Sequence, residues 1–372
     1  MKIGIVYHKF MPAGGQERYL FNVVNEFLRQ GHEVHLISAK RGDDRLPVHF
    51  HPVPIVNNPH SLRMLTFAFN SKKVIQSLDL DITYGLGKTF CHDVHRSGGG
   101  LHRLYLRQSG NLHRQWWSPK DRAALYLDKR LYHGGDTKWF VANSQLIKNE
   151  IVLNYEVDPQ KIDVIYTGVD HEKFNPALAA GTRDAMRAKL GLGANERVFL
   201  FASFDHPRKG LEQLLRAFPI TKGKLIVVGK PLGDLFKILI SKWNLRDRVI
   251  DAGPQQDMPS WYGLADFMVL PSFYDPLPNV VLESLACGTP VIVSAQTGAA
   301  ERIDEGKDGF VLKDAGDVAL LKEIFGRINS LSDAELKAMR AAAADKGSQF
   351  NLAEHVRSLV ALFERVRKLP RP

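Results

Sequence analysis

Short apolar segments of strand type alternate with amphipathic segments of helical spacing along most of this chain. KIGIVY (2–7) precedes a loop with two adjacent glycines, a helical stretch at 16–30, the helix-ending Gly31 and a second strand-like segment at 33–38. This order is a βαβ unit, in which two parallel strands are joined through a helix. Because such crossovers place helices on the faces of a parallel sheet, the alternation predicts α/β architecture.

The alternation begins a second time at RVFLFAS (197–203), which a helical stretch at 210–218 follows. Other strand-like segments lie at 82–86, 138–143, 224–229, 248–253, 267–272 and 290–294, and a last amphipathic helix lies at 352–369. The repetition predicts two Rossmann-like domains that are joined near residues 168–195. Ligands bind outside the carboxyl ends of the strands in such domains, so we expect a ligand cleft between the two.

We expect residues 1–168 together with 350–372 to form an N-terminal domain, and residues 169–349 to form a C-terminal domain. A length of 372 residues agrees with this division, because one domain typically holds ~100 to 200 residues. With 44% hydrophobic and 24% charged residues, the composition is that of a soluble globular protein.

The cysteines of the chain, Cys91 and Cys287, lie far apart and have no metal-type spacing. This favours a reducing compartment, without disulfides or structural zinc. No apolar run approaches the ~20 residues of a spanning helix, and the apolar start of the chain is too short for a signal peptide, so we expect a cytoplasmic protein. The net charge of +10 favours an anionic partner, which could be nucleic acid, a membrane surface or a phosphorylated ligand.

The segment YDPLPNVVLESLACGTPVIVS (274–294) places two acids around a predicted helix. Asn279 is expected to cap this helix, which begins at Val280, and Gly288 is expected to end it. The unpaired N–H groups at Pro278 to Val281 and the positive end of the helix dipole would attract an anion.

Glu283 lies one turn inside that helix, ~6 Å along its axis. A phosphate at the helix end would leave one hydroxyl group for Asp275 and another for Glu283, which is the layout of a nucleotide diphosphate sugar. In the alternative interpretation, Glu283 is a solvated helix residue and Asp275 an ordinary turn residue.

Two further loops carry ligand-type residues. Arg208 and Lys209 precede a helix N-terminus, where cations are unfavourable unless a bound diphosphate offsets the helix dipole; an exposed basic loop is the alternative. Gly14 and Gly15 precede the first helix and would let a ligand approach the backbone. They do not form the G-x-G-x-x-G pattern, so NAD binding is disfavoured.

These segments resemble a known family. YDPLPNVVLESLACGTPVIVS resembles the E-x7-E signature of retaining glycosyltransferases of the two-Rossmann-domain (GT-B), family-four type, with Asp275 in place of the first Glu. HPRKG (206–210) and PAGGQER (12–18) fall at the places expected for that family, and YTGVDHEKFNP (166–176) resembles its interdomain segment. The resemblance covers almost the whole chain.

The resemblance implies roles for individual residues. Glu283 would bind the ribose, Arg208 and Lys209 the diphosphate, and Asp275 the donor sugar, together with the loop backbone at Pro278, Asn279 and Val280. Asp275 is one methylene shorter than the Glu of the family pattern, so the donor is less firmly implied than the fold. In the N-terminal domain, Gly14 and Gly15 would approach the substrate.

YHKFMPAGGQER (7–18) and GLGKTFCHDVHRSGGG (85–100) resemble the members of this family that add glucose to an inner-core heptose of lipopolysaccharide. The second segment departs from their pattern, because SGGG stands where an acid is expected after HDV. Asp93 and His95 are therefore candidate catalytic residues of the sugar site. The alternative is that His92 and His95 lie on a loop surface.

The basic segment 102–133 combines Arg and Lys with aromatic residues. Tyr105, Trp116, Trp117 and Tyr126 lie among its cations. This mixture suits an anionic membrane surface, where each cation contributes ~1 kcal/mol. The alternative is a solvated helical face with some core aromatics.

The sequence thus predicts a retaining glycosyltransferase that moves a hexose, with glucose first, from a UDP-sugar to a saccharide such as the inner-core heptose. We expect front-face attack without a cofactor or metal ligands, a monomer, a glycan or glycolipid acceptor and no nucleic-acid partner. Alternatives are another donor or lipid acceptor in the same family, a nucleic-acid-binding protein, whose affinity would fall steeply with salt, and a small-molecule binding protein without catalysis.

Overall fold

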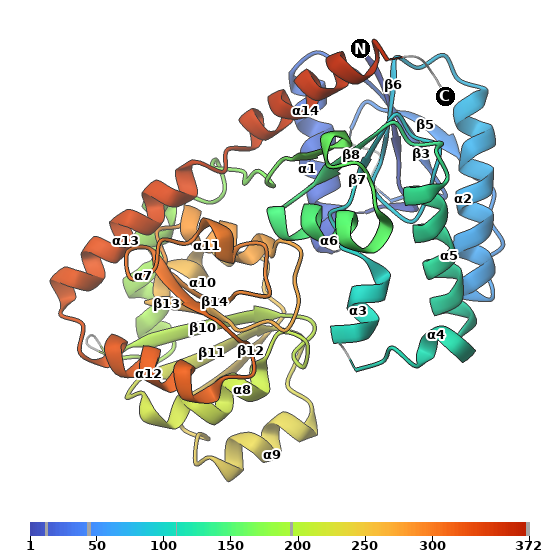
Figure 1. Ribbon diagram of the computed structural model, residues 1–372. Coiled ribbons are helices and arrows are strands. Elements are labelled where there is room, and N and C mark those ends of the chain that lie inside the picture. The colour runs from blue at the N-terminus through green and yellow to red at the C-terminus, as the bar shows by residue number, and fades with distance from the viewer. Residues whose placement is uncertain (12–13, 43–45, 109, 194–195, 370–372) are drawn as a thin grey trace. The chain divides into compact units, whose positions relative to one another are not determined.

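The computed structural model describes residues 1–11, 14–42, 46–108, 110–193 and 196–369 (Figure 1). The chain divides into two compact units. Unit 1 comprises Met1–Gly168 and Leu352–Pro372, and unit 2 comprises Val169–Asn351. Each unit is an α/β fold around its own parallel sheet, which confirms the predicted fold class of two Rossmann-like domains.

Unit 1 is built on a seven-stranded sheet. Its strands, in spatial order, are β5 (His49–Pro52), β3 (Glu33–Ser38), β1 (Lys2–Val6), β6 (Ile82–Gly85), β7 (Val94–Arg96), β8 (Trp139–Ala142) and β9 (Ile162–Val164). The described strand pairs are parallel, and Ile3 of β1 lies beside Val34 of β3 and Ile82 of β6. A separate two-stranded sheet joins β2 (Lys9–Phe10) and β4 (Lys40–Arg41).

Helices cover both faces of this sheet. They are α1 (Gly15–Arg29), α2 (His60–Gln76), α3 (His102–Gln108), α4 (Arg114–Trp117), α5 (Pro119–His133), α6 (Gln145–Tyr155), a 3-10 turn at Pro159–Lys161 and α14 (Leu352–Val366). On one face, α1 and α14 pack together over the central strands, through residues such as Leu20, Phe27 and Phe363 (Figure 1). On the other face, Phe67 of α2 packs over Ile37.

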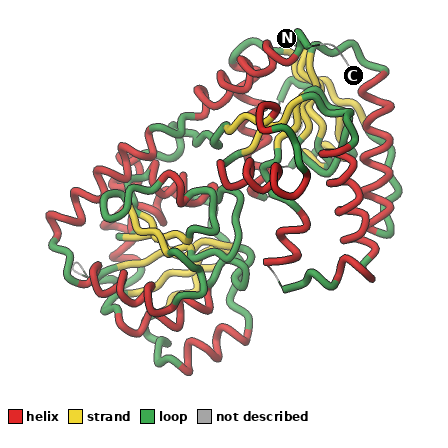
Figure 2. Tube along the Cα trace, in the orientation of Figure 1, coloured by secondary structure: helices red, strands yellow, loops and turns green. Residues whose placement is uncertain are grey.

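Unit 2 is built on a six-stranded sheet, whose strands are drawn in yellow in Figure 2. In spatial order they are β12 (Val249–Gly253), β11 (Lys224–Gly229), β10 (Val198–Ser203), β13 (Phe267–Leu270), β14 (Val291–Ser294) and β15 (Gly309–Leu312). The described pairs are parallel. Central strands such as FMVL of β13 are buried along their whole length, because helices cover both faces.

The helices of unit 2 alternate with these strands. They are α7 (Pro176–Lys189), α8 (Leu211–Ala217), α9 (Asp234–Lys242), α10 (Met258–Leu264), α11 (Asn279–Ala286), α12 (Val318–Asn329) and α13 (Asp333–Ser348), with 3-10 turns at Phe218–Ile220 and Ala300–Arg302. The region predicted as the joint between the domains, 168–195, therefore contains a full helix, α7, which the Asn175 side chain caps at the N–H of Leu178. In the described ranges, no helix combines the length and the apolar character that crossing a bilayer requires.

Candidate functional site

Two loops of unit 2 are joined where the order of its sheet reverses. The carboxyl ends of β10 and β13 form the topological switch point, because the chain adds β11 and β12 on the other side of β10 before it reaches β13. Ligands of doubly wound sheets bind at such points. Arg208 follows β10, and its Nη1 donates a 2.7 Å hydrogen bond to the carbonyl oxygen of Tyr274, which follows β13. The carbonyl oxygen of Arg208 accepts a 2.9 Å bond from the N–H of Phe273.

Lys209 lies beside Asp275 at this point. Its Nζ contacts Oδ2 of Asp275, and both side chains are buried. Burial lowers the pKa of Lys209 well below its usual range, the neighbouring charge of Arg208 lowers it further, and the charge of Asp205 acts in the opposite direction. Hydrogen bonds of 3.2 Å to Gln296 and 3.0 Å from Gly298 fix the Asp275 backbone to the loop after β14. Three loops therefore hold this ion pair.

Gly210 fixes the backbone conformation directly after Lys209. Its φ of +76° lies in the left-handed region, and a Cβ there would come within 2.1 Å of the carbonyl oxygen of Pro271. Only glycine avoids both the backbone strain and this contact. Gly210 is also the N-cap of α8, so it sets the point at which the loop of Arg208 and Lys209 ends.

The N-terminus of α11 lies directly after the loop of Asp275. The helix begins at Asn279, with Pro278 in the N-cap position, so the predicted capping role of Asn279 is wrong. The proline ring holds Pro278 in an extended conformation and offers no side-chain acceptor, while its carbonyl oxygen accepts a 3.0 Å bond from the N–H of Val281. Asn279 and Val280 are partly exposed. The positive end of the α11 dipole is thus not offset by a capping side chain.

Glu283 is buried in the second turn of α11. Its carboxylate is 6% exposed, and its Oε2 accepts a 2.8 Å hydrogen bond from the hydroxyl group of Tyr262 in α10. Asp275 is 8% exposed. The alternative interpretation of these residues as a solvated helix residue and an ordinary turn residue is therefore wrong. Buried carboxylates that are held by specific partners are candidates for a binding site.

Two residues of this site escaped the sequence analysis. Tyr262, which orients Glu283, lies 21 residues earlier in another helix, and no local pattern connects the two. Asp205 accepts a 2.7 Å hydrogen bond from Nε of Arg208. Its spacing of three residues from Arg208 was a usable signal, because residues three apart in a turn-like segment can meet.

In unit 1, Gly14 and Gly15 form the start of α1, after the strand at which the order of that sheet reverses. Gly14 is the N-cap of α1 in an extended conformation, and its carbonyl oxygen accepts a 2.9 Å bond from Arg18. Gly15 is the first residue of the helix. Pro12 and Ala13 of the same motif lie outside the described residues.

Asp93 precedes β7, so it lies at the amino end of that strand and not at the carboxyl edge. Its Oδ2 accepts 2.8 Å hydrogen bonds from the N–H and the hydroxyl group of Thr83, and its Oδ1 lies 2.8 Å from Nζ of Lys138. Burial raises the pKa of Asp93, but the hydrogen bonds from Lys138 and Thr83 outweigh this and hold it below the usual value. These contacts argue that Asp93 supports the sheet.

His95 is a member of β7, and His92 precedes it. They are 3% and 1% exposed, so the alternative that they lie on a loop surface is wrong. Their rings stack with centroids 5.6 Å apart, and Nε2 of His92 lies 2.8 Å from the hydroxyl oxygen of Thr89. Burial lowers the pKa of His92 to about 4 and that of His95 well below its usual value. Both rings are therefore neutral near pH 7.

The basic segment 102–133 forms α3, α4 and α5. Its acids are paired with cations: Asp121 lies 2.8 Å from Nε of Arg114 in the same segment, and Asp128 lies 2.6 Å from Nζ of Lys88, which lies outside it. Its exposed cations are Arg103, Arg107, Lys120, Arg122 and Lys129. Its aromatic residues Tyr105, Trp116, Trp117 and Tyr126 are also exposed, Trp116 by 77%. Tyr132 of the same segment is buried, so the alternative of a solvated helical face with some core aromatics also agrees with the structure.

Comparison with protein families agrees with this two-part architecture. The model of Glycosyltransferase Family 4 matches residues 13–173, and the model of Glycosyl transferases group 1 matches residues 182–346. The second match contains Arg208, Lys209, Asp275 and Glu283.

Curated relatives of this chain are also named as glycosyltransferases. D-inositol 3-phosphate glycosyltransferase of Mycolicibacterium smegmatis is 30% identical over 236 residues, which are 60% of this chain and 52% of that protein. The chain thus matches about half the length of such relatives. An uncharacterized glycosyltransferase of Methanocaldococcus jannaschii is 27% identical over 340 residues, 83% of this chain and 84% of that protein.

Solved structures share the fold over nearly the whole chain. WaaG, a glycosyltransferase involved in lipopolysaccharide biosynthesis, has a TM-score of 0.83 at 18% identity and covers 97% of this chain and 99% of its own. HepE of Anabaena, in complex with UDP and glucose, has a TM-score of 0.74 at 22% identity and covers 99% and 100%. The chain therefore belongs to the GT-B glycosyltransferases, with a family 4 domain followed by a group 1 domain.

Proposed function

We propose that this protein is a retaining glycosyltransferase that moves a hexose, with glucose as the expected sugar, from a UDP-sugar to a saccharide acceptor. The observation that carries the proposal is the meeting of Arg208, Lys209 and Asp275 next to the N-terminus of α11. Two cations and a positive helix end suit a diphosphate, and buried carboxylates suit the hydroxyl pairs on either side of it. HepE, which shares the fold, was crystallised with UDP and with UDP-glucose.

The donor is expected to bind with its diphosphate on Arg208, Lys209 and the N–H groups at Asn279 and Val280. Glu283, held by Tyr262, accepts hydroxyl groups of the ribose. Asp275 lies beside Lys209, so it can accept a hydroxyl group of the hexose next to the diphosphate. In this proposal, an acid lies on each side of the bound diphosphate.

Bond formation and bond breaking would occur on the same face of the hexose. The bond between the anomeric carbon and the diphosphate oxygen breaks, and the acceptor oxygen forms a bond to the anomeric carbon. The acceptor's proton passes to the departing diphosphate oxygen, so no separate carboxylate nucleophile is required, unlike in double displacement. Lys209 and Arg208 stabilise the charge that develops on the leaving group, and this replaces a metal ion.

The acceptor is expected to bind to unit 1, beside Gly14 and Gly15. The inner-core heptose of lipopolysaccharide is the proposed acceptor, because segments 7–18 and 85–100 resemble enzymes that act on it. In this proposal, Asp93 and His95 stabilise the sheet of unit 1. Neither is assigned a proton transfer, because the contacts of Asp93 and the burial of His95 are structural.

A panel of UDP-, GDP- and ADP-sugars tests the donor. A ligand that binds the native state stabilises it by RT ln(1 + [L]/Kd), so the UDP-sugar should raise the melting temperature most. Incubation with UDP-glucose and extracted core glycolipid should then release UDP. A shift without any UDP release would favour a binding protein without catalysis. If none of the sugars shifts the transition and free UDP binds no better, the proposal is wrong.

We also propose that segment 102–133 contacts an anionic membrane surface, because its tryptophans and cations are exposed together. Sedimentation with vesicles that contain anionic lipid should carry the protein down, and Trp116→Ala with Trp117→Ala should weaken this binding. Leu235→Ala with Ile238→Ala, which removes exposed apolar residues from α9, is the matched control. Equal binding to neutral vesicles, or equal loss in the control, would contradict the proposal. Preferential binding to oligonucleotides would favour the nucleic-acid alternative.

A further inference from the structure

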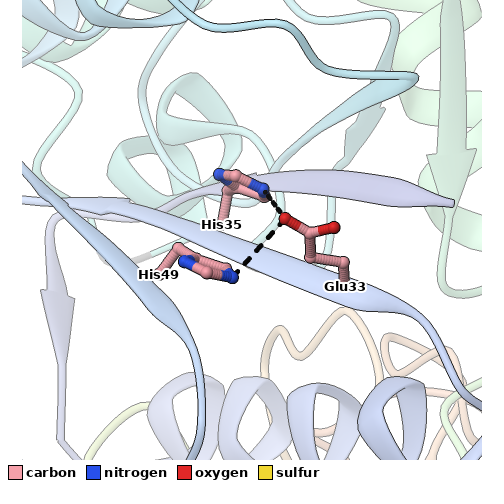
Figure 3. A group of neighbouring side chains, drawn as sticks. All are labelled: Glu33, His35 and His49. Atoms are coloured by element: carbon pink, nitrogen blue, oxygen red, sulfur yellow. Dashed lines mark hydrogen bonds and ion pairs between the residues drawn. The ribbon is translucent and has the colours of Figure 1, made fainter.

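A cluster of histidines and an acid lies on strands β3 and β5 of unit 1. His35 of β3 and His49 of β5 are direct neighbours across the strand pair, and Glu33 is two residues before His35. Since side chains two apart share one face of a strand, Glu33, His35 and His49 lie on the same face. Figure 3 shows both imidazoles directed at the carboxylate of Glu33.

The ligand-type atoms of these three side chains converge. Nε2 of His35 lies 2.9 Å from Oε1 of Glu33, and Nε2 of His49 lies 3.4 Å from the same oxygen. One ligand atom from each residue lies within 4.8 Å of the other two. A tetrahedral ion with bonds of ~2.0 to 2.1 Å holds its ligand atoms about 3.3 Å apart. These separations are at most about 1.5 Å greater than that ideal, so small rotations of the side chains would bring the three ligand atoms around one ion.

A fourth residue prepares His35 for this role. Nδ1 of His35 lies 2.9 Å from Nε2 of His51, and the two rings are nearly parallel, with an interplanar angle of 7°. When Nδ1 of His35 donates to His51, Nε2 of His35 keeps its lone pair for a metal. Histidine ligands of zinc are generally fixed through their second nitrogen in this way.

The charges around the cluster suit a cation. Glu33 supplies a carboxylate to the cluster beside the two imidazoles. Lys2 is nearby, but its Nζ lies 3.1 Å from Oδ2 of Asp79 and is paired there.

We propose that Glu33, His35 and His49 bind a zinc ion, with His51 orienting His35 and a water in the fourth position. Two imidazoles and one carboxylate match zinc, whereas magnesium and calcium prefer oxygen ligands throughout. The sequence indicated no metal ligands, because its cysteines lack metal-type spacing and Arg208 with Lys209 were expected to replace a metal. The sequence contains an E-x-H pair, Glu33 and His35, and an H-x-H pair, His49 and His51. They form one cluster only because β3 pairs with β5.

The position of this site separates it from sugar transfer. Glu33 and His49 are the first residues of their strands, so the site lies at the amino ends. The residues proposed to bind the donor follow the carboxyl ends of strands in unit 2. Zinc here would therefore hold the edge strand β5 to β3 and stabilise unit 1, and it would not take part in the proposed reaction.

Calorimetry of the full, metal-stripped chain with zinc chloride tests the site. Wild-type protein should bind one equivalent of zinc with saturation, and its melting temperature should rise, while magnesium chloride should do neither. Glu33→Gln and His49→Gln should each abolish this binding, and His51→Gln should weaken it about 10-fold or more. Cobalt(II) should give the visible absorption of a tetrahedral ion in the wild type and not in the Glu33→Gln and His49→Gln variants.

His133→Gln removes an exposed imidazole outside the cluster and is the matched control, which should bind zinc like the wild type. Far-ultraviolet circular dichroism of the metal-free variants reports whether they remain folded. Absence of saturable zinc binding in the wild type, or equal binding in the folded Glu33 and His49 variants, would overturn the proposal. EDTA should lower the melting temperature without lowering the initial rate of UDP release, which keeps this test separate from that of the proposed function.

Discussion

The hydroxyl group of Tyr262 donates a 2.8 Å hydrogen bond to Oε2 of Glu283, so a residue of α10 orients the buried carboxylate of α11. Tyr262→Phe removes this bond and leaves the ring in place. Because a hydrogen bond to a charged group contributes ~1.5 kcal/mol or more, the Kd for UDP should rise about 10-fold. Titration calorimetry with UDP measures the change, and turnover at saturating donor should fall much less.

Tyr126→Phe, an exposed tyrosine of unit 1, provides the control for that measurement. Glu283→Ala should weaken UDP binding more than Tyr262→Phe, since it removes the acceptor itself. An unchanged Kd in both the Tyr262 and the Glu283 variants would show that the ribose is bound elsewhere.

Lys209→Ala should reduce turnover about 100- to 1,000-fold, the loss typical of a group that stabilises charge in a transition state. It should also destabilise the fold by about 3 kcal/mol, because the buried Asp275 loses its partner. Adding Asp275→Asn to Lys209→Ala should restore much of the stability and none of the turnover. Steady-state kinetics and urea unfolding separate the two effects.

Lys242→Ala, at the exposed end of α9, should change neither property. EDTA should leave the turnover of the wild type nearly unchanged if Lys209 and Arg208 replace a metal. Turnover that depends fully on magnesium, or a Lys209→Ala variant with near-normal turnover, would contradict this role.

Gly210→Ala should destabilise unit 2 by several kcal/mol and reduce turnover. The reason is the positive φ of +76° together with the carbonyl oxygen of Pro271 at 2.1 Å from a Cβ. Gly181→Ala is the matched substitution: Gly181 lies inside α7 and a Cβ there meets nothing within 4 Å, so it should stabilise by up to ~1 kcal/mol. Unfolding curves that change equally for the two variants would refute the assigned conformation of Gly210.

Stability should fall as the pH falls below about 6.5. Burial lowers the pKa of His92 to about 4, and burial together with the charge of Arg96 lowers that of His355 to about 3. Both are neutral in the folded state and take up a proton on unfolding. Below pH ~6.5, each histidine therefore lowers the free energy of unfolding by up to ~1.4 kcal/mol per pH unit. Their contribution is complete above pH ~6.5 and is lost as the pH falls towards these values.

Urea unfolding at several pH values between 7.5 and 5 measures this slope. His92→Gln should flatten it by up to the contribution of one histidine, whereas His133→Gln, an exposed histidine, should not. A free energy of unfolding that is the same at pH 5 and pH 7.5 would contradict the neutral, buried state of these rings.

The sequence was sufficient to predict the two parallel sheets, because their strands are continuous apolar segments separated by helices. It also indicated Arg208, Lys209, Asp275 and Glu283 as candidate ligand-binding residues, because the first three lie in loops after strands and Glu283 lies one turn inside the helix after such a loop. It could not predict the contact between Lys209 and Asp275, since that depends on β10 lying beside β13. The pairing of non-consecutive strands leaves no local pattern.

The expectations for HDVH (92–95) show a second limit. The alternative interpretation placed His92 and His95 on a loop surface, whereas both are buried and His95 belongs to β7, a strand of three residues in the interior of the sheet. A strand of three residues is too short to show an alternation of apolar and polar side chains. Histidine is a polar residue type, so its presence in a sequence does not indicate burial. Burial here comes from the neighbouring β6 and β8 and from nothing within the segment.

Helix α14 contributes Val356, Leu359, Leu362 and Phe363 to the core beside α1, although more than 300 residues separate them in the chain. During synthesis, all of unit 2 leaves the ribosome before these side chains do. Unit 2 is continuous and can complete its fold at once, while the first 168 residues must wait with one apolar face uncovered. Chaperones that recognise nascent apolar surface should therefore bind this half of the chain longer than the other.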